Sequence, residues 1–303
     1  MTTRYLLGIA MLFAIAAIWG VGFVFQREGM DHIGPFTFNA ARFIIGALSV
    51  IPVIAIFSKP TSQNEDTSST FIGGMLAGVM LFIGISLQQI GLVHTSAGKA
   101  AFITGMYIVF VPIFGMFLGQ KMGGKVWVAA AIAVIGLYLL SITDQLKFAR
   151  GDGLVLIAAV FWGGQVLVAA HYSPKVNGPK FAFVQFATVA IISLPFAVMG
   201  EVITLDALIL SAQALLFTGL IATGLAMTLQ ILAQARVPST QAAMIMSLET
   251  VFGAFSGWLL LGEILTSRML LGAVLMLLGI VIAQLPGRRM QKPIRWSFRR
   301  KQF

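Results

Sequence analysis

The chain has 303 residues, of which 58% are hydrophobic and only 10% are charged, and its formal net charge is +10. Soluble domains carry about 25% charged residues, so this composition excludes a protein whose surface is covered mainly by water. Cysteine is absent, which excludes disulfides, thiolate chemistry and cysteine-based metal sites.

Ten apolar segments are long enough to cross a bilayer, whose hydrocarbon core of about 30 Å needs roughly 17–25 residues per helix. In chain order we expect them at residues 6–25, 36–57, 71–93, 100–118, 126–142, 154–170, 181–199, 208–232, 240–261 and 269–285. The first segment resembles a signal peptide, but its apolar run continues to Phe25 without a cleavage motif, so we interpret it as a retained span. The sequence therefore predicts an all-α integral membrane protein with ten transmembrane helices.

Two stretches that start 142 residues apart are nearly alike: residues 86–101 read SLQQIGLVHTSAGKAA and residues 228–243 read TLQILAQARVPSTQAA. Other landmarks keep almost the same spacing, namely Trp19-Gly20 with Trp162-Gly163, Pro52 with Pro195, and Gly34-Pro35 with Gly178-Pro179. We therefore expect a tandem duplication, with halves at 1–143 and 144–286 and a basic tail at 287–303. The matched prolines predict paired kinks.

Each predicted half contains five spans, so the second half enters the membrane upside down relative to the first. Inverted repeats of this kind are typical of transporters that work by alternating access around a central cavity.

The distribution of Lys and Arg predicts that both termini lie in the cytoplasm. Fourteen basic residues, seven of them in the tail, then lie inside against five outside, and Arg42 lies within a span. The tail contains no acid, and we expect it to contact an anionic lipid leaflet rather than nucleic acid. The expected location is the cytoplasmic (inner) membrane, as a multi-pass protein.

Two long stretches carry a family resemblance: TSAGKAAFITGMYIVFVPIFGMFLGQ in the first half and QAAMIMSLETVFGAFSGWLLLGEILTSRMLLGAVLMLLGIVI in the second. With the Trp-Gly pair in the first span of each half, they resemble the EamA-type transporters of the drug/metabolite transporter superfamily over essentially the whole chain. Glu249-Thr250 stands where that family usually has Glu-Pro, and Gly119-Gln120 stands where the first half would have Gly-Glu. The resemblance implies export of small organic solutes, including amino acids, related metabolites and drug-like compounds, through a cavity between the halves.

Glu249 is a carboxylate near the middle of the ninth predicted span. A charged group at that depth costs roughly 3 kcal/mol, so it should face a partner or a wet cavity. One interpretation is a substrate contact or proton-coupling group, and the other is a structural acid that bonds a neighbouring helix. The position 142 residues earlier is Tyr107, so the two side chains are expected to converge near the repeat axis.

Arg42 lies six residues inside the second predicted span, with Asn39 one turn before it. We expect Arg42 either to hold a carboxylate of the substrate or to snorkel to the outer interface.

Matched polar and aromatic residues complete the candidate site. Gln88 and Gln230 occupy equivalent positions and are expected to face the cavity, whereas interhelical hydrogen bonds explain the other glutamines. Trp19 and Trp162, on the first helix of each half, are expected beside the cavity, where aromatic and Met side chains can form a soft pocket.

These features predict a secondary transporter, most directly an exporter of a small solute. The alternatives are a passive channel or lipid scramblase and, from a different class, an intramembrane enzyme. The three histidines lie at or beyond span ends without an acid at ligand spacing, and no Walker-type phosphate loop is present, so we expect no enzymatic activity, cofactor or metal. The expected substrate-binding residues are Gln88, Tyr107, Gln230, Glu249, Trp19, Trp162, Arg42 and Asn39, with Glu249 also the coupling residue.

Overall fold

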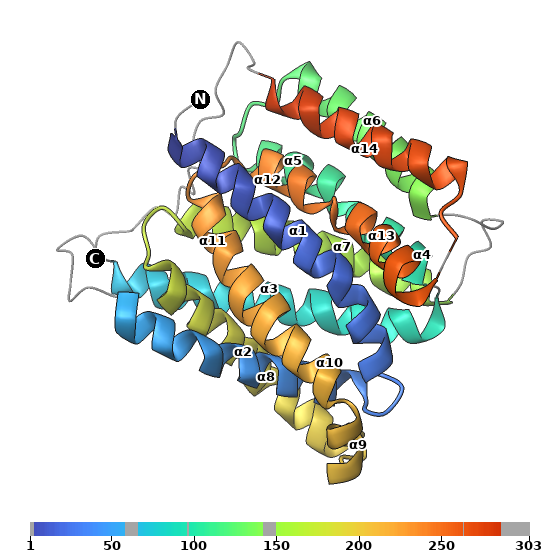
Figure 1. Cartoon of the computed structure of the whole chain (residues 1–303). Helices are drawn as coiled ribbons and strands as arrows, with labels where there is room; N and C mark the ends of the chain where they lie inside the picture. The colour runs from blue at the N-terminus through green and yellow to red at the C-terminus, as the bar shows by residue number, and fades with distance from the viewer. Residues whose placement is uncertain (1–2, 58–65, 96, 142–149, 263, 286–303) are drawn as a thin grey trace.

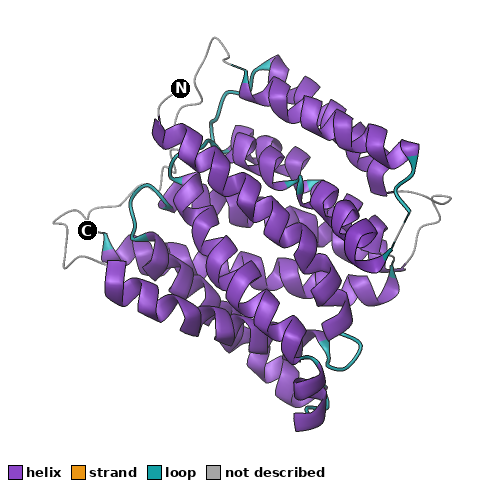
Figure 2. Ribbon diagram, viewed as in Figure 1, coloured by secondary structure: helices purple, strands orange, loops and turns teal. Residues whose placement is uncertain are grey.

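The computed structural model describes residues 3–57, 66–95, 97–141, 150–262 and 264–285. These residues form helices joined by short loops, without a strand among them (Figure 2). Ten helical segments are long and apolar enough to cross a bilayer, which confirms the predicted all-α membrane fold. The tail 287–303 and its expected lipid contact lie outside the described residues.

Seven spans are continuous helices: α1 (Thr3–Gly29), α2 (Pro35–Phe57), α3 (Thr67–His94), α6 (Gly124–Ser141), α7 (Arg150–Tyr172), α8 (Gly178–Gly200) and α14 (Ser267–Gln284). Polar side chains define where several of them begin. Asp66 accepts a hydrogen bond from the backbone N–H of Ser69 before α3, and Thr266 accepts one from Met269 before α14. Such N-caps satisfy backbone donors that have no partner within the helix.

The fourth, eighth and ninth spans are divided. The fourth consists of α4 (Ala97–Gly105) and α5 (Tyr107–Phe117), and the ninth of α12 (Ser239–Met246) and α13 (Glu249–Leu261). The short helix α9 (Leu205–Leu210) precedes the eighth, which consists of α10 (Ala212–Leu216), a π-helix η1 (Phe217–Met227) and α11 (Thr228–Gln234). Pro52 and Pro195, where kinks were expected, lie inside α2 and α8, and both helices continue past the proline.

The most extensive packing joins helices from different halves of the chain. α3 packs along α7, α6 along α14 and α2 along α8, and Figure 1 shows α6 and α14 side by side at one edge of the bundle. Small residues permit the closest approach: a Cβ added to Gly136 of α6 would lie 2.6 Å from the backbone oxygen of Gly272 in α14. The two repeats are therefore interleaved.

The bundle buries amides among its apolar core residues and exposes apolar side chains on its outer faces. Gln165 and Gln185 are fully buried, whereas Ile191, in the middle of α8, is 67% exposed and Leu259, near the end of α13, is 63% exposed. This pattern suits helices whose outer faces contact lipid. Apolar side chains are compatible with lipid tails, and buried amides can form hydrogen bonds with one another inside the bundle. α1 begins and α14 ends at the same face of the bundle, as ten crossings require (Figure 1).

Candidate functional site

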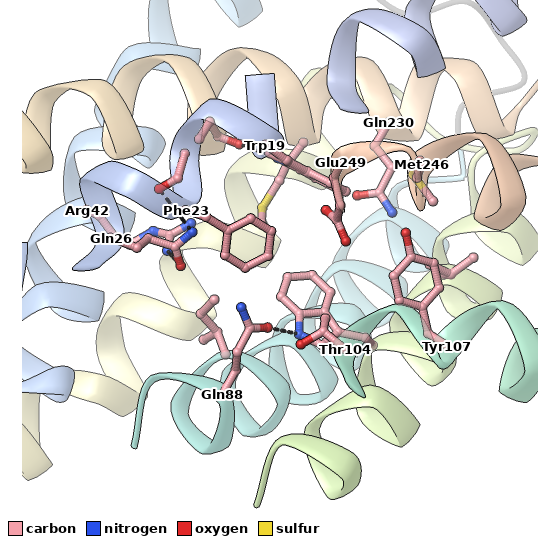
Figure 3. A pocket seen from close by; sticks show the side chains of 16 residues that line it. Trp19, Phe23, Gln26, Arg42, Gln88, Thr104, Tyr107, Gln230, Met246 and Glu249 are labelled. Atoms are coloured by element: carbon pink, nitrogen blue, oxygen red, sulfur yellow. Dashed lines mark hydrogen bonds between the residues drawn. The ribbon is translucent and has the colours of Figure 1, made fainter. Parts of the chain in front are cut away.

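A cavity of about 40 Å³ lies inside the bundle between the two halves (Figure 3). A volume of this size holds about three water molecules. The first half contributes Trp19, Gly22, Phe23, Gln26, Arg42, Ile85, Gln88, Thr104 and Tyr107 to its wall, and the second half Trp162, Val166, Ala222, Met227, Gln230, Met246 and Glu249. All the residues expected from the sequence to bind substrate are in this wall except Asn39.

Tyr107 and Glu249 begin the second segment of the two matched broken spans. The residues before them share nearly the same backbone conformation, with φ −61° and ψ −12° at Met106 and φ −61° and ψ −10° at Leu248. Each of these two residues also donates its N–H to the carbonyl three residues earlier, at 3.1 Å. The repeat therefore extends to the local backbone, and it places a phenol and a carboxyl group at equivalent points of the cavity wall.

The glycine of each Trp-Gly pair packs against one of these broken spans. A Cβ on Gly20 would lie 2.6 Å from the Cβ of Phe252 and 2.7 Å from the backbone oxygen of Glu249. A Cβ on Gly163 would lie 3.2 Å from the Cβ of Phe110, the equivalent position in the first half. The repeated motif therefore brings the first helix of one half against the break of the other.

The tryptophans of the two pairs meet at the cavity, with ring centroids 6.3 Å apart and planes inclined by 55°. Nε1 of Trp162 donates to Oε1 of Gln88 at 2.7 Å. Nε1 of Trp19 does not use the equivalent Gln230 and donates instead to the backbone oxygen of Ala222 in η1, at 2.9 Å. The two halves thus hold matched indoles in different hydrogen bonds.

Gln230 belongs to an amide chain that crosses three helices. Its Nε2 donates to Oε1 of Gln165 at 3.1 Å, and Nε2 of Gln165 donates to Oε1 of Gln185 at 3.4 Å. The first half has no such chain, because the residue three positions after Trp19 is Gly22. Gln230 therefore has two roles. It lines the cavity, and it also forms the kind of interhelical hydrogen bond that was expected of the other glutamines.

Arg42 turns into the bundle rather than to the outer interface, and it is 2% exposed. Its Nη1 donates to Oε1 of Gln26 at 3.3 Å, and its Nε and Nη2 donate to Oγ1 of Thr223 at 3.3 and 3.2 Å. The guanidinium carbon lies 5.0 Å from the ring centroid of Phe43. Asn39, one turn earlier, is fully buried, and neither polar atom of its amide has a hydrogen-bond partner.

Several polar groups of the cavity wall have unused bonding capacity. The hydroxyl of Thr104, Oε1 of Gln230 and the hydroxyl of Tyr107, which lies on the same side of the cavity as Glu249, have no hydrogen-bond partner (Figure 3). Buried polar groups in native proteins are nearly always satisfied, and an unpaired one costs about 1–3 kcal/mol. These groups are therefore available to a solute or to ordered water.

Nine wall residues are not among the substrate-binding residues expected from the sequence: Gly22, Phe23, Gln26, Ile85, Thr104, Val166, Ala222, Met227 and Met246. Helical spacing could have identified Gln26, because it lies two turns after Trp19 on the same face of α1. Thr104 and Met246 precede the breaks of their spans, so regular helical periodicity does not place them.

The chemistry of the wall suits an organic solute with polar groups. Among the described residues, no group of three or more His, Asp or Glu side chains could hold a metal ion. The wall combines aromatic and Met side chains with amides, hydroxyls, one guanidinium and one carboxyl group. A mostly apolar pocket with a few convergent polar groups is typical of small-molecule sites.

Comparisons with known proteins agree with this architecture. The model of the EamA-like transporter family matches residues 6–142 and 149–284. An uncharacterized transporter of Archaeoglobus fulgidus is 34% identical over 284 residues, covering 92% of this chain and 85% of its own length. A crystal structure with a TM-score of 0.76 and 15% sequence identity covers 92% of this chain and 96% of that chain, which shows the same fold.

Two further relatives have names that state a substrate class. The threonine/homoserine exporter RhtA of Escherichia coli K12 is 25% identical over 280 residues, covering 91% of this chain and 88% of RhtA. A probable amino-acid metabolite efflux pump of Salmonella typhimurium is 26% identical over 286 residues, covering 88% of this chain and 91% of the pump. These relatives are named as transporters or efflux pumps and not as enzymes. The chain therefore belongs to the EamA-like transporter family, within the drug/metabolite transporter superfamily, and it is a multi-pass membrane protein that transports a small solute.

Proposed function

We propose that the protein is a secondary transporter that exports a small amino acid or a related metabolite from the cytoplasm by alternating access. The observation that carries this proposal is the cavity whose wall is built from both inverted halves at matched helix breaks. Discontinuous helices at the interface of inverted repeats are where secondary transporters bind their solutes. The names of two relatives support the solute class and the outward direction.

The size of the cavity favours a carrier over a passive channel or a lipid scramblase. A space of about 40 Å³ does not admit a solute of amino-acid size unless the surrounding helices move. A carrier requires such movement in every cycle, whereas a channel requires a continuous wet path.

Glu249 supplies the proposed coupling. Its carboxyl group is 7% exposed, and no described residue forms an ion pair with it. In the proposed cycle Glu249 alternately holds a proton and the amino group of the solute, so that proton entry and solute exit use the same site. The proposal also places the protein in the cytoplasmic membrane with both termini inside, as the distribution of basic residues favours.

Counterflow in reconstituted vesicles tests the proposal. Vesicles that contain the protein are loaded with an unlabelled amino acid, and uptake of the same labelled amino acid is followed across a panel that includes L-threonine and L-homoserine. A carrier gives saturable uptake that internal solute stimulates. Linear uptake without stimulation, or scrambling of labelled phospholipid, would point to the channel or scramblase alternative, and the absence of flux for every amino acid would reject the proposed solute class.

A further inference from the structure

Arg42 is a buried cation without an ionic partner. It lines the cavity and is 2% exposed. Among the described residues, no carboxyl group pairs with its guanidinium, whose side-chain hydrogen bonds go only to Gln26 and Thr223. Placing a charge in a membrane interior without a counter-charge is unfavourable, so Arg42 is stabilised most when an anion enters the cavity.

The guanidinium of Arg42 retains free donors. Its hydrogen bonds are 3.2–3.3 Å long and go to neutral oxygens, whereas bonds between a guanidinium and a carboxylate are typically about 2.7–2.9 Å. A guanidinium has five N–H groups, and these bonds leave one free on each terminal nitrogen. The rings of Phe38 and Phe43 flank the group and offer no further acceptor. Two N–H groups at the end of the fork match the two oxygens of a carboxylate.

The surroundings hold Arg42 in place. Thr223, which accepts two of its bonds, lies in the π-helix η1. Helix α2 approaches η1 so closely that a Cβ on Gly46 would lie 2.6 Å from Cγ2 of Thr223. Nε2 of Gln26 donates to the backbone oxygen of Gly22 at 3.4 Å, which leaves Oε1 of Gln26 facing Arg42. A charged group fixed in advance binds a ligand at a smaller entropic cost.

We propose that Arg42 is a carboxylate-binding subsite of the cavity. This inference rests on the proposed transport function and adds that the solute carries a carboxylate group. In Figure 3 Arg42 and Glu249 lie on opposite sides of Phe23, so the wall carries a guanidinium on one side of this ring and a carboxyl group on the other. A zwitterionic solute satisfies both groups, whereas an amine without a carboxylate leaves Arg42 uncompensated.

Binding of a minimal carboxylate tests the subsite. The full-length protein, purified in detergent, is titrated with sodium propionate at constant ionic strength while tryptophan fluorescence is recorded, because Trp19 and Trp162 line the same cavity. Propionamide has nearly the same shape without the charge and serves as the ligand control. We expect a saturable signal with propionate and none with propionamide. The absence of saturable propionate binding to the wild-type protein would overturn the proposal.

Three variants locate the binding. Arg42→Gln is expected to weaken propionate binding at least tenfold, and Arg42→Lys at least threefold, because an ammonium group lacks the planar fork. Arg27→Gln removes an exposed arginine at the end of α1 and is expected to leave binding unchanged. Unchanged affinity in a folded Arg42→Gln protein would overturn the subsite. Where that variant does not fold, Arg42→Lys decides, and wild-type affinity in the lysine form would have the same consequence.

Transport measurements separate this inference from the proposed function. Propionate binding that depends on Arg42, together with no amino-acid flux in vesicles, would support the subsite and reject export of amino acids. Equal flux of L-threonine and L-threoninol, which lacks the carboxylate, would reject the subsite while transport itself stands.

Discussion

Glu249 combines an ionisable side chain with a break in a membrane helix. Its carboxyl group faces the phenol of Tyr107, and the unpaired groups of Thr104 and Gln230 line the same cavity. The charged form of a carboxyl group at such a depth costs roughly 3 kcal/mol unless something compensates it. A proton or a cationic group of the solute provides that compensation. The two exclude each other, because a protonated carboxyl group is neutral and cannot form an ion pair with the solute.

We expect Glu249→Gln to abolish the pH dependence of transport while the protein stays folded, because the amide keeps the size and hydrogen bonding of the acid but cannot exchange a proton. Efflux from vesicles across a pH series measures the effect, with thermal stability recorded for each form. Glu28→Gln alters an exposed acid and serves as the matched control, with wild-type pH dependence expected. If Glu249→Gln also keeps that dependence, Glu249 is a structural residue.

Gln88 has a measurable structural role through Trp162. Gln88→Leu leaves the partly buried indole N–H of Trp162 without its acceptor, and we expect the free energy of unfolding in detergent to fall by about 1 kcal/mol. Gln89→Leu is the matched control, because Gln89 is equally buried and donates only to the sulfur of Met30, a weak acceptor. In a Trp162→Phe background the effect of Gln88→Leu should shrink, as a double-mutant cycle requires. Equal losses for both glutamine variants would contradict this account.

The helix breaks depend on contacts between elements. The break of the ninth span, at residues 247–248, contains neither proline nor glycine. Helix α1 packs against it through Gly20. The equivalent contact of Gly163 in α7 against α5 is looser, because its nearest neighbour would lie 3.2 Å from an added Cβ instead of 2.6 Å.

We therefore expect Gly20→Ala to displace α13 and to reduce transport strongly, and Gly163→Ala to have a smaller effect. The methyl group of Gly20→Ala would require backbone atoms of α13 to move. The methyl group of Gly163→Ala meets only a tight side-chain contact. Transport rate and thermal stability of the two variants provide the measurement. A larger loss in Gly163→Ala would show that the cavity does not depend on this packing.

The sequence predicted the spans well and the breaks not at all. Length and apolar composition determine which segments can cross a bilayer, and both are visible without a structure. Pro52 and Pro195 predicted paired kinks, and α2 and α8 continue past them, because membrane helices tolerate proline where neighbours satisfy the freed backbone groups. The π-helix η1 follows from tertiary contacts, since α2 packs closely against it and the indole of Trp19 binds the backbone oxygen of Ala222.

The same distinction applies to the candidate site. Repeat symmetry brought Tyr107 and Glu249 to one cavity wall, because equivalent positions of inverted halves lie near the repeat axis. The depth of Arg42 was compatible with either the interface or the interior, and only the packing of α2 on η1 directs it inward. Asn39, one turn before Arg42, is fully buried but does not line the cavity.

At the scale of the whole molecule, the two sequence repeats do not coincide with the groups of helices that pack together. The helices of one half pack mainly on helices of the other, as in the pairs α3 with α7 and α2 with α8 (Figure 1). Glu201, just after α8, strengthens one such pair, because its carboxylate accepts hydrogen bonds from the backbone N–H groups of Phe36 and Thr37 at 2.9 and 2.7 Å. We infer that any rocking motion carries helices of both halves together.

Single-cysteine labelling tests the proposed orientation, since the natural chain has no cysteine. Gly123 and Gly200 are suitable positions, because a Cβ at either meets no atom within 4 Å. With both termini in the cytoplasm, Gly200→Cys should react with an impermeant thiol reagent added to intact cells, and Gly123→Cys should react only after the membrane is opened. The reverse pattern would invert the topology of the whole chain.

Interleaved packing also constrains how such a protein is made. During synthesis the first five spans enter the membrane before their packing partners exist, so Arg42 has no Thr223 to hold it and the glycine face of α6 has no α14. The first half by itself is therefore an exposed intermediate for the insertion machinery to protect. A half that stood alone would need a second copy, inserted in the opposite direction, to bury the same surfaces.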